Sequence, residues 1–382
     1  MPIGPFRRRD PIRVQPFYGF RNAERLTLNA RALRSQLASF EKRSFLRDVA
    51  TMAGQYMSRE VAGLKVELEY ELTEGSRVTA QVISDIEGYA QFDVALPDGA
   101  AMPEEVCWDK ATVRWISEEG EEHQAIAYIL VPGMKTELGL ISDIDDTIME
   151  TGITGSFRMI ARNWKRVLRQ MPSERVVVPG AAEFYEALGG SAEADQSAAD
   201  TGTAIEPRAR KRPVFYVSSS PWNLFSYLVT FKRSRGIPLG PVALRDWGFN
   251  RKTLGSEGHG SHKRDAIESI LAAFPHMKFA LIGDDTQKDL VAFGAIARDH
   301  PDRIAAVFIR RISEEPLNAD ENAAQAAIEA VDVPFWNGKD YLEAKEFLQS
   351  AGLELDASGE KLLRTAAEDD APLPGAGPAE GN

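Results

Sequence analysis

Apolar and polar positions along the first third of the chain follow two patterns. Residues 11–33 are expected to form short extended pieces, and from 32 to 58 apolar residues recur near helical spacing, which predicts a helix. At residues 64–72 apolar and charged residues alternate, as in a strand with one buried face. Further short runs, separated by turn residues, lie at residues 77–86, 90–96, 111–116 and 124–131. This pattern predicts an antiparallel β region of five or more strands and favours a sandwich.

The pattern changes after Pro132 and Gly133. Short, fully apolar runs separated by helical stretches lie at residues 138–141, 214–217, 279–282 and 304–309. This alternation predicts an α/β fold, in which a parallel sheet is connected by crossover helices. Ligands of such sheets bind at the carboxyl ends of the strands. Asp143, Ser218 and Asp284 closely follow the first three runs, so we expect them near a site.

The length of 382 residues and the change of pattern predict more than one domain. We divide the chain into an N-terminal helical segment with the antiparallel β domain (residues 1–133), a catalytic α/β domain (residues 134–350) and a disordered acidic Pro/Gly tail (residues 351–382). Residues 189–211 are mostly small and polar, which indicates a mobile surface insertion.

Composition narrows the function classes. A net charge of −12 argues against broad nucleic-acid binding. No apolar run approaches the roughly 20 residues of a membrane span, and the basic N-terminus lacks the apolar stretch of a secretory signal. With Cys107 as the single cysteine, no intrachain disulfide and no cysteine-based zinc cage can form. We therefore expect a cytoplasmic protein without a transmembrane segment.

The densest group of reactive residues is the decapeptide Gly-Leu-Ile-Ser-Asp-Ile-Asp-Asp-Thr-Ile at residues 139–148. Its carboxylates repel one another, and a bound divalent cation such as Mg²⁺ is the simplest compensation. A carboxylate beside a hard cation can attack phosphorus and form an aspartyl-phosphate, so Asp143 is the expected nucleophile. Asp145 is placed to protonate the leaving oxygen and then to activate water, which favours a phosphatase. Thr147 is expected to hold the turn.

A second segment, Phe-Tyr-Val-Ser-Ser-Ser-Pro-Trp at residues 215–222, places hydroxyl groups at a strand end before a helix N-terminus. Such an arrangement can donate hydrogen bonds to phosphate. Ser218 is best positioned, and Ser219 and Ser220 are alternatives because one sequence does not fix the register. Ser220 can instead cap the helix, with Pro221 at its first position.

The third segment is the helix start Ser-His-Lys-Arg-Asp at residues 261–265. A cation here can neutralise the charge that develops on phosphate and restrain the nucleophile. We predict that Lys263 provides this cation, and its neighbours in sequence, His259, His262 and Arg264, are the alternatives.

The fourth segment, residues 279–289, again places carboxylates after a buried strand and a glycine. Asp284 or Asp285 is expected to complete an octahedral Mg²⁺ shell. With Asp143 and Asp145, they form the predicted set of metal ligands. Asp289 is expected to orient a metal-bound water or Lys263.

In this order the four segments resemble the haloacid dehalogenase superfamily of phosphatases. Residues 139–148 and 216–222 are similar to the catalytic domain of the actin-patch-type phosphatidate phosphatases, and Leu-Arg-Asp-Trp-Gly at 244–248 and residues 282–289 extend the match. The resemblance covers about residues 134–345.

The resemblance implies a Rossmann-like haloacid dehalogenase domain, preceded by a β-sandwich-like domain. It also implies Mg²⁺ dependence and conversion of phosphatidate to diacylglycerol, with Asp143 as nucleophile and Asp145 as acid/base. One departure concerns the metal ligands. The family shows Gly-Asp-Ser where this chain has Gly283, Asp284 and Asp285.

A lipid substrate requires a surface that contacts a membrane. Residues 157–171 combine basic and apolar residues, as interfacial helices do, and the alternative is an ordinary surface helix. Further candidates for membrane contact are Trp164, Trp222, Phe225, Tyr227, Lys232, Arg233 and Arg235.

The sequence therefore predicts a Mg²⁺-dependent phosphomonoester hydrolase of lipid metabolism that acts on phosphatidate, with possible peripheral contact to a membrane. One alternative is the same chemistry on a soluble phosphomonoester. The other is a non-catalytic module that binds a membrane or a partner.

Overall fold

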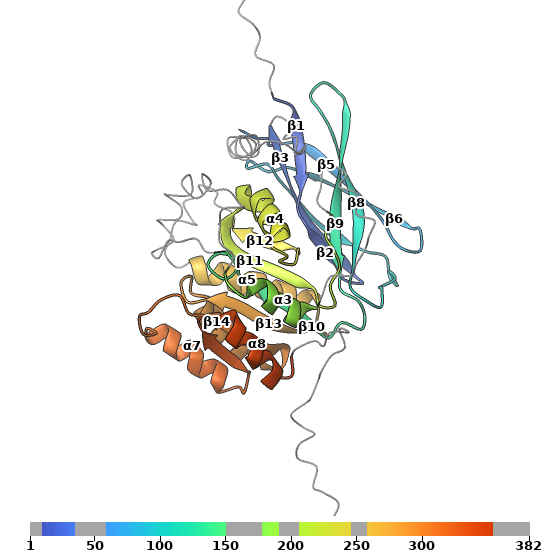
Figure 1. The fold of residues 1–382 in the computed structure, drawn as a ribbon. Helices are drawn as coiled ribbons and strands as arrows, with labels where there is room; N and C mark the ends of the chain where they lie inside the picture. The colour runs from blue at the N-terminus through green and yellow to red at the C-terminus, as the bar shows by residue number, and fades with distance from the viewer. Residues whose placement is uncertain (1–9, 35–58, 150–177, 191–205, 246–257, 354–382) are drawn as a thin grey trace, which may run out of the picture.

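The computed structural model describes residues 10–34, 59–149, 178–190, 206–245 and 258–353 (Figure 1). Two sheets organise these residues, a mixed sheet of nine strands and a parallel sheet of six. In Figure 1 the first sheet, blue to teal, lies beside the second sheet and its helices. The prediction of an α/β fold with a parallel sheet is confirmed.

The first sheet follows the order β1-β3-β2-β9-β8-β5-β6, and β4 and β7 also pair with β3. Its strands are β1 (Ile12–Pro16), β2 (Gly19–Arg21), β3 (Arg25–Arg34), β4 (Arg59–Glu60), β5 (Lys65–Glu71), β6 (Arg77–Ile83), β7 (Tyr89–Ala95), β8 (Cys107–Ile116) and β9 (Glu122–Val131). Alternate residues of β5, such as Val66 and Leu68, face the core, as the alternation in sequence predicts. Because hydrogen bonds join all nine strands, the division into two sheets of a sandwich stays a prediction.

The beginning of the predicted helix over residues 32–58 is wrong. Ala32 and Leu33 lie in β3, where they pair with Val14 and Arg13 of β1. The helical spacing beyond residue 34 lies outside the described residues. Leu26, Leu28, Ala30 and Ala32 are each at most 1% exposed, so the most deeply buried positions of β3 keep a period of two into the segment that we assigned to the helix.

The second sheet has the order β12-β11-β10-β13-β14-β15. Its strands are β10 (Leu138–Ser142), β11 (Val214–Pro221), β12 (Val242–Arg245), β13 (Lys278–Asp284), β14 (Ile304–Arg310) and β15 (Phe335–Gly338). The chain builds outward from β10 to β12 and then resumes on the other side of β10 with β13. The strand order thus reverses between β10 and β13, and crevices at such switch points are the usual ligand sites of parallel sheets.

Helices cover both faces of the parallel sheet. The helices α3 (Ala181–Gly189), α4 (Phe225–Ser234) and α8 (Tyr341–Ser350) share one core cluster with the sheet. The helices α5 (Gly258–Ala273), α6 (Asp289–Asp299) and α7 (Ala319–Glu329) share the other. No helix of the described residues is long and apolar enough to cross a membrane.

Aromatic rings join the two sheets. The ring centroid of Phe17 lies 4.4 Å from that of Trp222 and 4.6 Å from that of Phe225. Trp222, Phe225 and Tyr227 are 9%, 5% and 3% exposed, so these side chains pack inside the protein. The prediction that they contact a membrane is therefore wrong, because the aromatic residues that precede β2 and β3 cover them.

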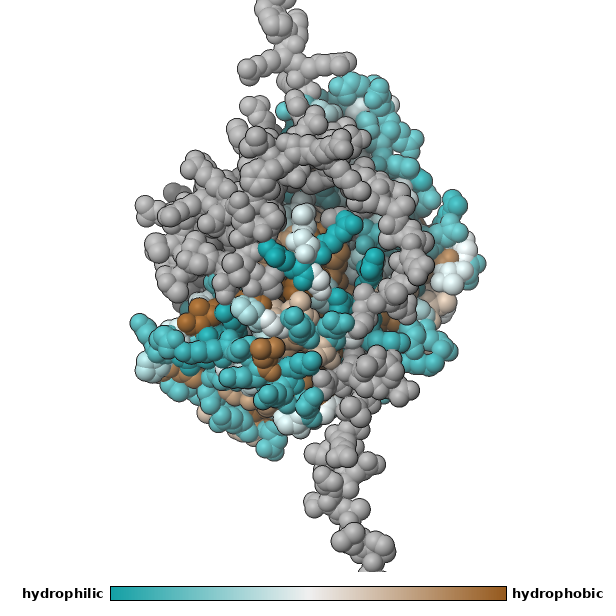
Figure 2. Space-filling model, viewed as in Figure 1, coloured by the Kyte–Doolittle hydropathy of each residue, from teal (hydrophilic) through white to brown (hydrophobic). Residues whose placement is uncertain are grey.

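The remaining residues proposed for membrane contact differ in their exposure. Lys232 is fully buried, whereas Arg233 is exposed and Arg235 is half-buried. Trp164 and residues 157–171 lie outside the described residues. On the described part of the face in Figure 2, brown residues form small separate groups among teal ones.

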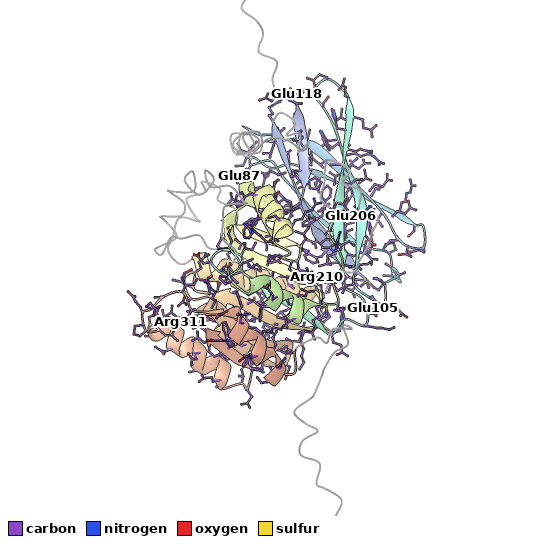
Figure 3. The ribbon with its side chains drawn as sticks, viewed as in Figure 1. Glu87, Glu105, Glu118, Glu206, Arg210 and Arg311 are labelled. Carbon is purple, nitrogen blue, oxygen red and sulfur yellow. The ribbon has the colours of Figure 1, made fainter. Side chains whose placement is uncertain are left out.

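The segment predicted to be a mobile insertion is anchored at its described ends. Arg210 donates to the carbonyl groups of Gly190 at 2.9 Å and Gly236 at 3.1 Å. Glu206 forms an ion pair with Lys110 of the first sheet at 2.8 Å. Both labelled side chains lie near the boundary of the two sheets (Figure 3). Residues 191–205, which make up most of the insertion, lie outside the described residues.

Replacing Lys232 with Met is expected to stabilise the protein. Lys232 Nζ has no hydrogen-bond partner among the described residues, and it lies 3.5 Å from the ring centroid of Tyr216. Burial lowers the pKa of Lys232 well below its ordinary value. The fold thus favours the neutral amine, and the unfolded chain binds an extra proton up to its pKa of about 10.4. The variant should gain on the order of 1 kcal/mol or more at pH 7.

Urea unfolding at pH 7 and pH 9 measures this gain. Between the lowered pKa in the folded state and the ordinary pKa in the unfolded state, the wild type becomes more stable as pH rises, so the advantage of Lys232→Met should shrink. Lys278→Met, at an exposed lysine, is the control and should change little. A loss of stability in Lys232→Met would show that a charged amine over the Tyr216 ring stabilises the fold.

The last helix, α8, ends at the predicted domain boundary at residue 350, but the packed chain continues to Leu353. Leu353 is buried, and its N–H donates to the carbonyl of Leu348 at 2.9 Å. Arg212 Nη1 donates to the carbonyls of Leu188 and Leu353, each at 2.6 Å, and so joins the ends of α3 and α8. The free energy of unfolding should therefore be about 2–4 kcal/mol lower for a chain that ends at Ser350 than for one that ends at Leu353. Equal urea unfolding curves would contradict this role.

Candidate active site

Asp143 lies directly after β10, at the reversal of strand order. Its N–H donates to the carbonyl of Ile282 in β13 at 2.8 Å, and its side chain is 1% exposed. Because Ser142 pairs with Ile282, the residues that follow β10 and the end of β13 lie side by side. The topology therefore brings the first and fourth predicted segments together.

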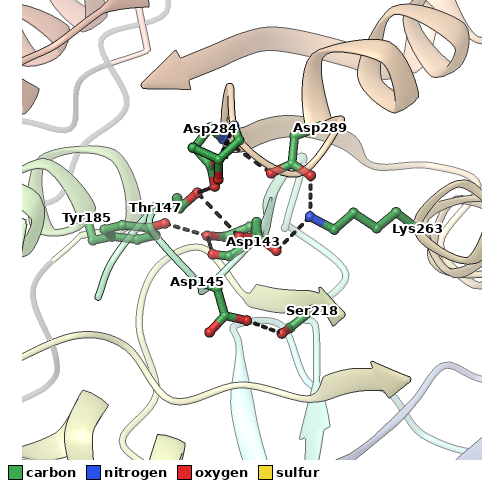
Figure 4. A network of polar contacts seen from close by, with 10 residues as sticks. Asp143, Asp145, Thr147, Tyr185, Ser218, Lys263, Asp284 and Asp289 are labelled. Carbon is green, nitrogen blue, oxygen red and sulfur yellow. Dashed lines mark hydrogen bonds and ion pairs between the residues drawn. The ribbon is translucent and has the colours of Figure 1, made fainter. Parts of the chain in front are cut away.

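Lys263, from the first half of α5, joins two of the carboxylates. Its Nζ donates to Asp143 Oδ1 at 2.8 Å and also to Asp289 Oδ1 (Figure 4). All three side chains are almost fully buried. Burial lowers the pKa of Lys263, but the carboxylates of Asp143, Asp289 and Asp284 outweigh this effect and raise it above the ordinary value. The lysine is thus held as a cation.

Asp284 ends β13 and faces the same cluster. Thr147 Oγ1 donates to Asp284 Oδ2 at 3.0 Å and lies 3.5 Å from Asp143 Oδ2. The N–H of Thr286 donates to Asp284 Oδ1 at 2.6 Å. Burial, followed by the carboxylate of Asp289, raises the pKa of Asp284 to about 8, although Lys263 opposes the shift.

The pKa of Asp143 is also raised well above its ordinary value. Burial is the main cause, and the carboxylates of Asp289, Asp284 and Asp145 add to it, while Lys263 acts in the opposite direction. The structure thus holds carboxylates that repel one another in a volume that excludes water. When they are ionised, a further positive charge would stabilise them.

The residues present fit a hard divalent cation. Asp143, Asp284 and Asp289 each offer a carboxylate oxygen, and these three atoms lie within 4.8 Å of one another. Three carboxylates against one lysine leave two negative charges, which match a divalent ion, and oxygen donors are the ligands that Mg²⁺ prefers. Asp289 Oδ2 also accepts a hydrogen bond from the N–H of Asp284 at 3.2 Å. Both oxygens of Asp289 are thus hydrogen-bonded, one to Lys263 and one to the end of β13.

Asp285 lies apart from this cluster, although the sequence left it as a possible metal ligand. Its Oδ2 forms an ion pair with Arg311 Nε at 2.8 Å, and its Oδ1 accepts the N–H of Ile312 at 2.9 Å. Arg311 is at the α7 side of the second sheet (Figure 3). Adjacent side chains at a strand end point to opposite sides, which is why only Asp284 reaches Asp143.

Asp145 also departs from the predicted metal set. Its Oδ2 accepts a hydrogen bond from Ser218 Oγ at 2.9 Å, on another side of Asp143 from Asp284 (Figure 4). Asp145 is not part of the three-carboxylate group. Asp143 and Asp284 thus contribute to the carboxylate group that fits a cation, whereas Asp145 is hydrogen-bonded to Ser218.

The other candidates divide as follows. Arg264 pairs with Glu268 at 2.8 Å and Asp299 at 2.9 Å, away from the cluster. The side chains of Ser219, Ser220 and His259 lie outside the described residues, so the choice among the three serines rests on Ser218 alone.

Three groups at the site were not predicted from the sequence. The Tyr185 hydroxyl is hydrogen-bonded to Ser142 Oγ, which donates to the carbonyl of Asp143. The Tyr341 hydroxyl donates to the carbonyl of Thr147 at 3.0 Å, and Arg310 Nη1 donates to that of Asp146 at 2.7 Å. No local pattern signals such contacts, because the donors lie in distant helices and strands.

Residues of the second sheet are similar to a known catalytic domain. A family model described as "Phosphatidate phosphatase APP1, catalytic domain" matches residues 138–311. Residues 138–311 are thus similar to this catalytic domain. The match runs from β10 through β14 and stops before α7, β15 and α8. The resemblance to the catalytic domain of phosphatidate phosphatases is confirmed.

Two curated yeast proteins are similar to this chain. The phosphatidate phosphatase APP1 of Saccharomyces cerevisiae is 33% identical over 188 residues, which are 48% of this chain and 28% of that protein. An uncharacterized protein of Schizosaccharomyces pombe is 21% identical over 235 residues, 61% of this chain and 35% of that protein. The chain thus spans 28% and 35% of the length of these relatives.

Solved structures add nothing to this assignment. The β-glucuronidase of Bifidobacterium dentium complexed with coumarin-3-O-glucuronide matches with a TM-score of 0.22 and 11% identity, over 87% of this chain and 60% of that chain. Chitinase ChiW from Paenibacillus sp. str. FPU-7 matches with a TM-score of 0.18 and 11% identity, over 80% and 25%. A likeness this low supports no inference about fold or function.

Substitutions of the two neighbouring aspartates test which one faces a metal. Above pH 8, where the Asp284 carboxylate is ionised, Asp284→Asn should raise the melting temperature of the metal-free protein, because it removes one of three repelling charges. It should also abolish the stabilisation by Mg²⁺, which is about 2.7 kcal/mol at 100 times the dissociation constant. Asp285→Asn is the matched control. It should lower stability by weakening the contacts to Arg311 and Ile312 but keep the response to Mg²⁺.

Thermal unfolding with and without MgCl₂ measures both effects. A response to Mg²⁺ that persists in Asp284→Asn and disappears in Asp285→Asn would reverse the assignment.

Proposed function

We propose that this chain is a Mg²⁺-dependent phosphomonoester hydrolase that acts through an aspartyl-phosphate on Asp143, with phosphatidate as its substrate. One observation supports this most strongly. A buried carboxylate at the end of β10 is held by a lysine, beside Asp284 on one side and Asp145 on the other. A nucleophile, a cation site and an acid/base thus lie within one site, as phosphoryl transfer requires.

The first half of the reaction uses Asp143 and Asp145. A carboxylate oxygen of Asp143 forms a bond to phosphorus while the bond from phosphorus to the leaving oxygen breaks, and Asp145 gives that oxygen a proton. Lys263 restrains the Asp143 carboxylate and offers positive charge to the phosphoryl oxygens. Asp143 and Asp284 would hold Mg²⁺, which would supply further positive charge for phosphoryl transfer.

The second half reverses the role of Asp145. Now ionised, it takes a proton from a water molecule, and the oxygen of that water attacks phosphorus as the bond to Asp143 breaks. Inorganic phosphate leaves, and both carboxylates return to their starting state. Ser218 donates its hydroxyl proton to Asp145 Oδ2 at 2.9 Å. When Asp145 is protonated it can donate to Ser218 Oγ instead, and the Ser218 hydroxyl can then donate to a phosphoryl oxygen.

We further propose that residues 134–350 form a Rossmann-like domain of the haloacid dehalogenase superfamily. The parallel strand order and the Asp143–Lys263–Asp284 group support this proposal. A sandwich-like domain over residues 1–133 precedes it. The lipid substrate is supported by the name of the yeast relative, and a peripheral membrane contact belongs to the same proposal.

A soluble phosphomonoester is the second candidate substrate. It is favoured by one observation, the burial of Trp222, Phe225 and Tyr227, which removes the aromatic residues proposed for membrane contact. Under this alternative the chemistry and the site residues are unchanged.

Phosphate release from an aryl phosphate, soluble phosphomonoesters and phosphatidate in mixed micelles, each with and without Mg²⁺, tests the proposal. We expect Mg²⁺-dependent release, fastest with phosphatidate, and faster release from soluble esters would favour the second candidate. Asp143→Asn should reduce turnover by about 10³-fold or more, because no other group replaces the nucleophile. Asp285→Asn, whose carboxylate lies outside the cluster, is the control. A chain that holds Mg²⁺ but releases no phosphate would be a binding module, and full turnover in Asp143→Asn would refute the mechanism.

A further inference from the structure

The turn after β10 holds a backbone conformation that needs support. Asp146 has a φ of 59°, in the left-handed region that disfavours residues other than glycine. Its N–H donates to the carbonyl of Met149 at 2.9 Å, and the N–H of Ile148 donates to that of Ile144 at 3.0 Å. Asp143 and Asp145 both lie on this turn, so its shape sets the direction of the two carboxylates.

A buried tyrosine holds one carbonyl of the turn. The Tyr341 hydroxyl donates to the carbonyl of Thr147 at 3.0 Å, and Tyr341 is 1% exposed. Its ring stacks on Phe184 at 4.8 Å and on Trp336 at 6.1 Å between centroids. Tyr341 is the first residue of α8, and Asp340 caps that helix by accepting the N–H of Leu342. The hydroxyl is therefore fixed by packing on both sides and by a capped helix.

An arginine holds the preceding carbonyl. Arg310 ends β14, where it pairs with Asp284 of β13, and its Nη1 donates to the carbonyl of Asp146 at 2.7 Å. Two consecutive carbonyl groups are thus bound by side chains from two separate elements, β14 and α8. This arrangement fixes both the position and the rotation of the peptide between Asp146 and Thr147.

We propose that Tyr341 and Arg310 are positioning residues of the site: they hold the carbonyls of Thr147 and Asp146 and so aim the carboxylates of Asp143 and Asp145. This inference rests on the proposed function for its catalytic part. Tyr341 lies beyond residues 138–311, so the segment after the catalytic-domain match completes the site. A displacement of about 1 Å in such a group can cost up to 10²-fold in rate.

The test compares two variants of the full chain, each of which loses one buried tyrosine hydroxyl. Tyr341→Phe removes the donor to Thr147. Tyr216→Phe removes a hydroxyl that donates to the carbonyl of Pro238 at 2.6 Å, at a fully buried position of the second sheet. With an aryl phosphate and Mg²⁺, kcat of Tyr341→Phe should fall by about 10-fold with KM within about twofold. Tyr216→Phe should keep both values within about twofold, whatever either variant loses in melting temperature.

Arg310 is tested by a pair of substitutions. Arg310→Met should lower kcat in the same way, and Arg310→Lys, which retains a donor, should restore part of the loss. A rise in KM with kcat unchanged would mean that Arg310 binds the substrate, which would overturn its role as a positioning residue.

Amide hydrogen exchange gives a readout that does not depend on activity. The amides of Asp146 and Ile148 should exchange at least about 10-fold faster in Tyr341→Phe than in the wild type, and not in Tyr216→Phe. If the wild type hydrolyses no phosphomonoester, the proposed function fails, while exchange still decides whether Tyr341 holds the turn. Unchanged exchange in Tyr341→Phe, or an unchanged kcat in an active enzyme, would overturn the inference.

Discussion

The ion pairs of Lys263 with Asp143 and Asp289 are the interaction on which the site depends. A buried carboxylate without a partner costs several kcal/mol, and here three of them lie close together. One lysine compensates part of this charge and leaves the rest. A bound cation would relieve the remaining repulsion, so the repulsion among the carboxylates and the affinity that we propose for a cation have the same origin. The three residues come from β10, α5 and α6, so this pairing also fixes two helices against the sheet.

The sheet topology explains why this charge gathers at one point. The strands β10 and β13 are hydrogen-bonded neighbours although α3, α4 and α5 lie between them in sequence. The pairing of Ser142 with Ile282 places Asp143 level with Gly283, one residue before Asp284 along the strand. A shift of one residue would exchange Asp284 for Asp285, because side chains alternate at a strand end. The Asp285 side chain points away from that of Asp284 and forms an ion pair with Arg311, which stabilises the observed register.

The sequence predicts local patterns well and distant contacts poorly. The decapeptide at 139–148 and the apolar run before Asp284 were sufficient to locate the ends of β10 and β13. The predicted strand end before Ser218, with a helix from Pro221, was wrong, because β11 continues to Pro221. The choice between Asp284 and Asp285 could not be made from the sequence, because it depends on register with β10. Tyr341 and Arg310 could not be found either, since they are 194 and 164 residues from the carbonyls that they bind.

Burial was the other property that the sequence concealed. Trp222 and Phe225 are of the residue type that is common on membrane-contacting surfaces. Only the structure shows that Phe17 packs against both. The strands β12 and β15 were not predicted because four residues are too few to establish a period.

The same aromatic contacts relate the first sheet to the chemistry. Trp222 follows β11 directly, four residues after Ser218, and Phe17 and Tyr18 of the first sheet pack on the segment from Trp222 to Phe225. Each of these rings buries about 150–250 Å² of surface, so separating the sheets would expose a large apolar area. Interfaces of this kind resist relative motion, in contrast to the polar contacts of independently moving domains. The first sheet therefore packs against the segment that follows β11, the strand that carries Ser218. A first sheet that moved freely to recruit a partner would lose that contact.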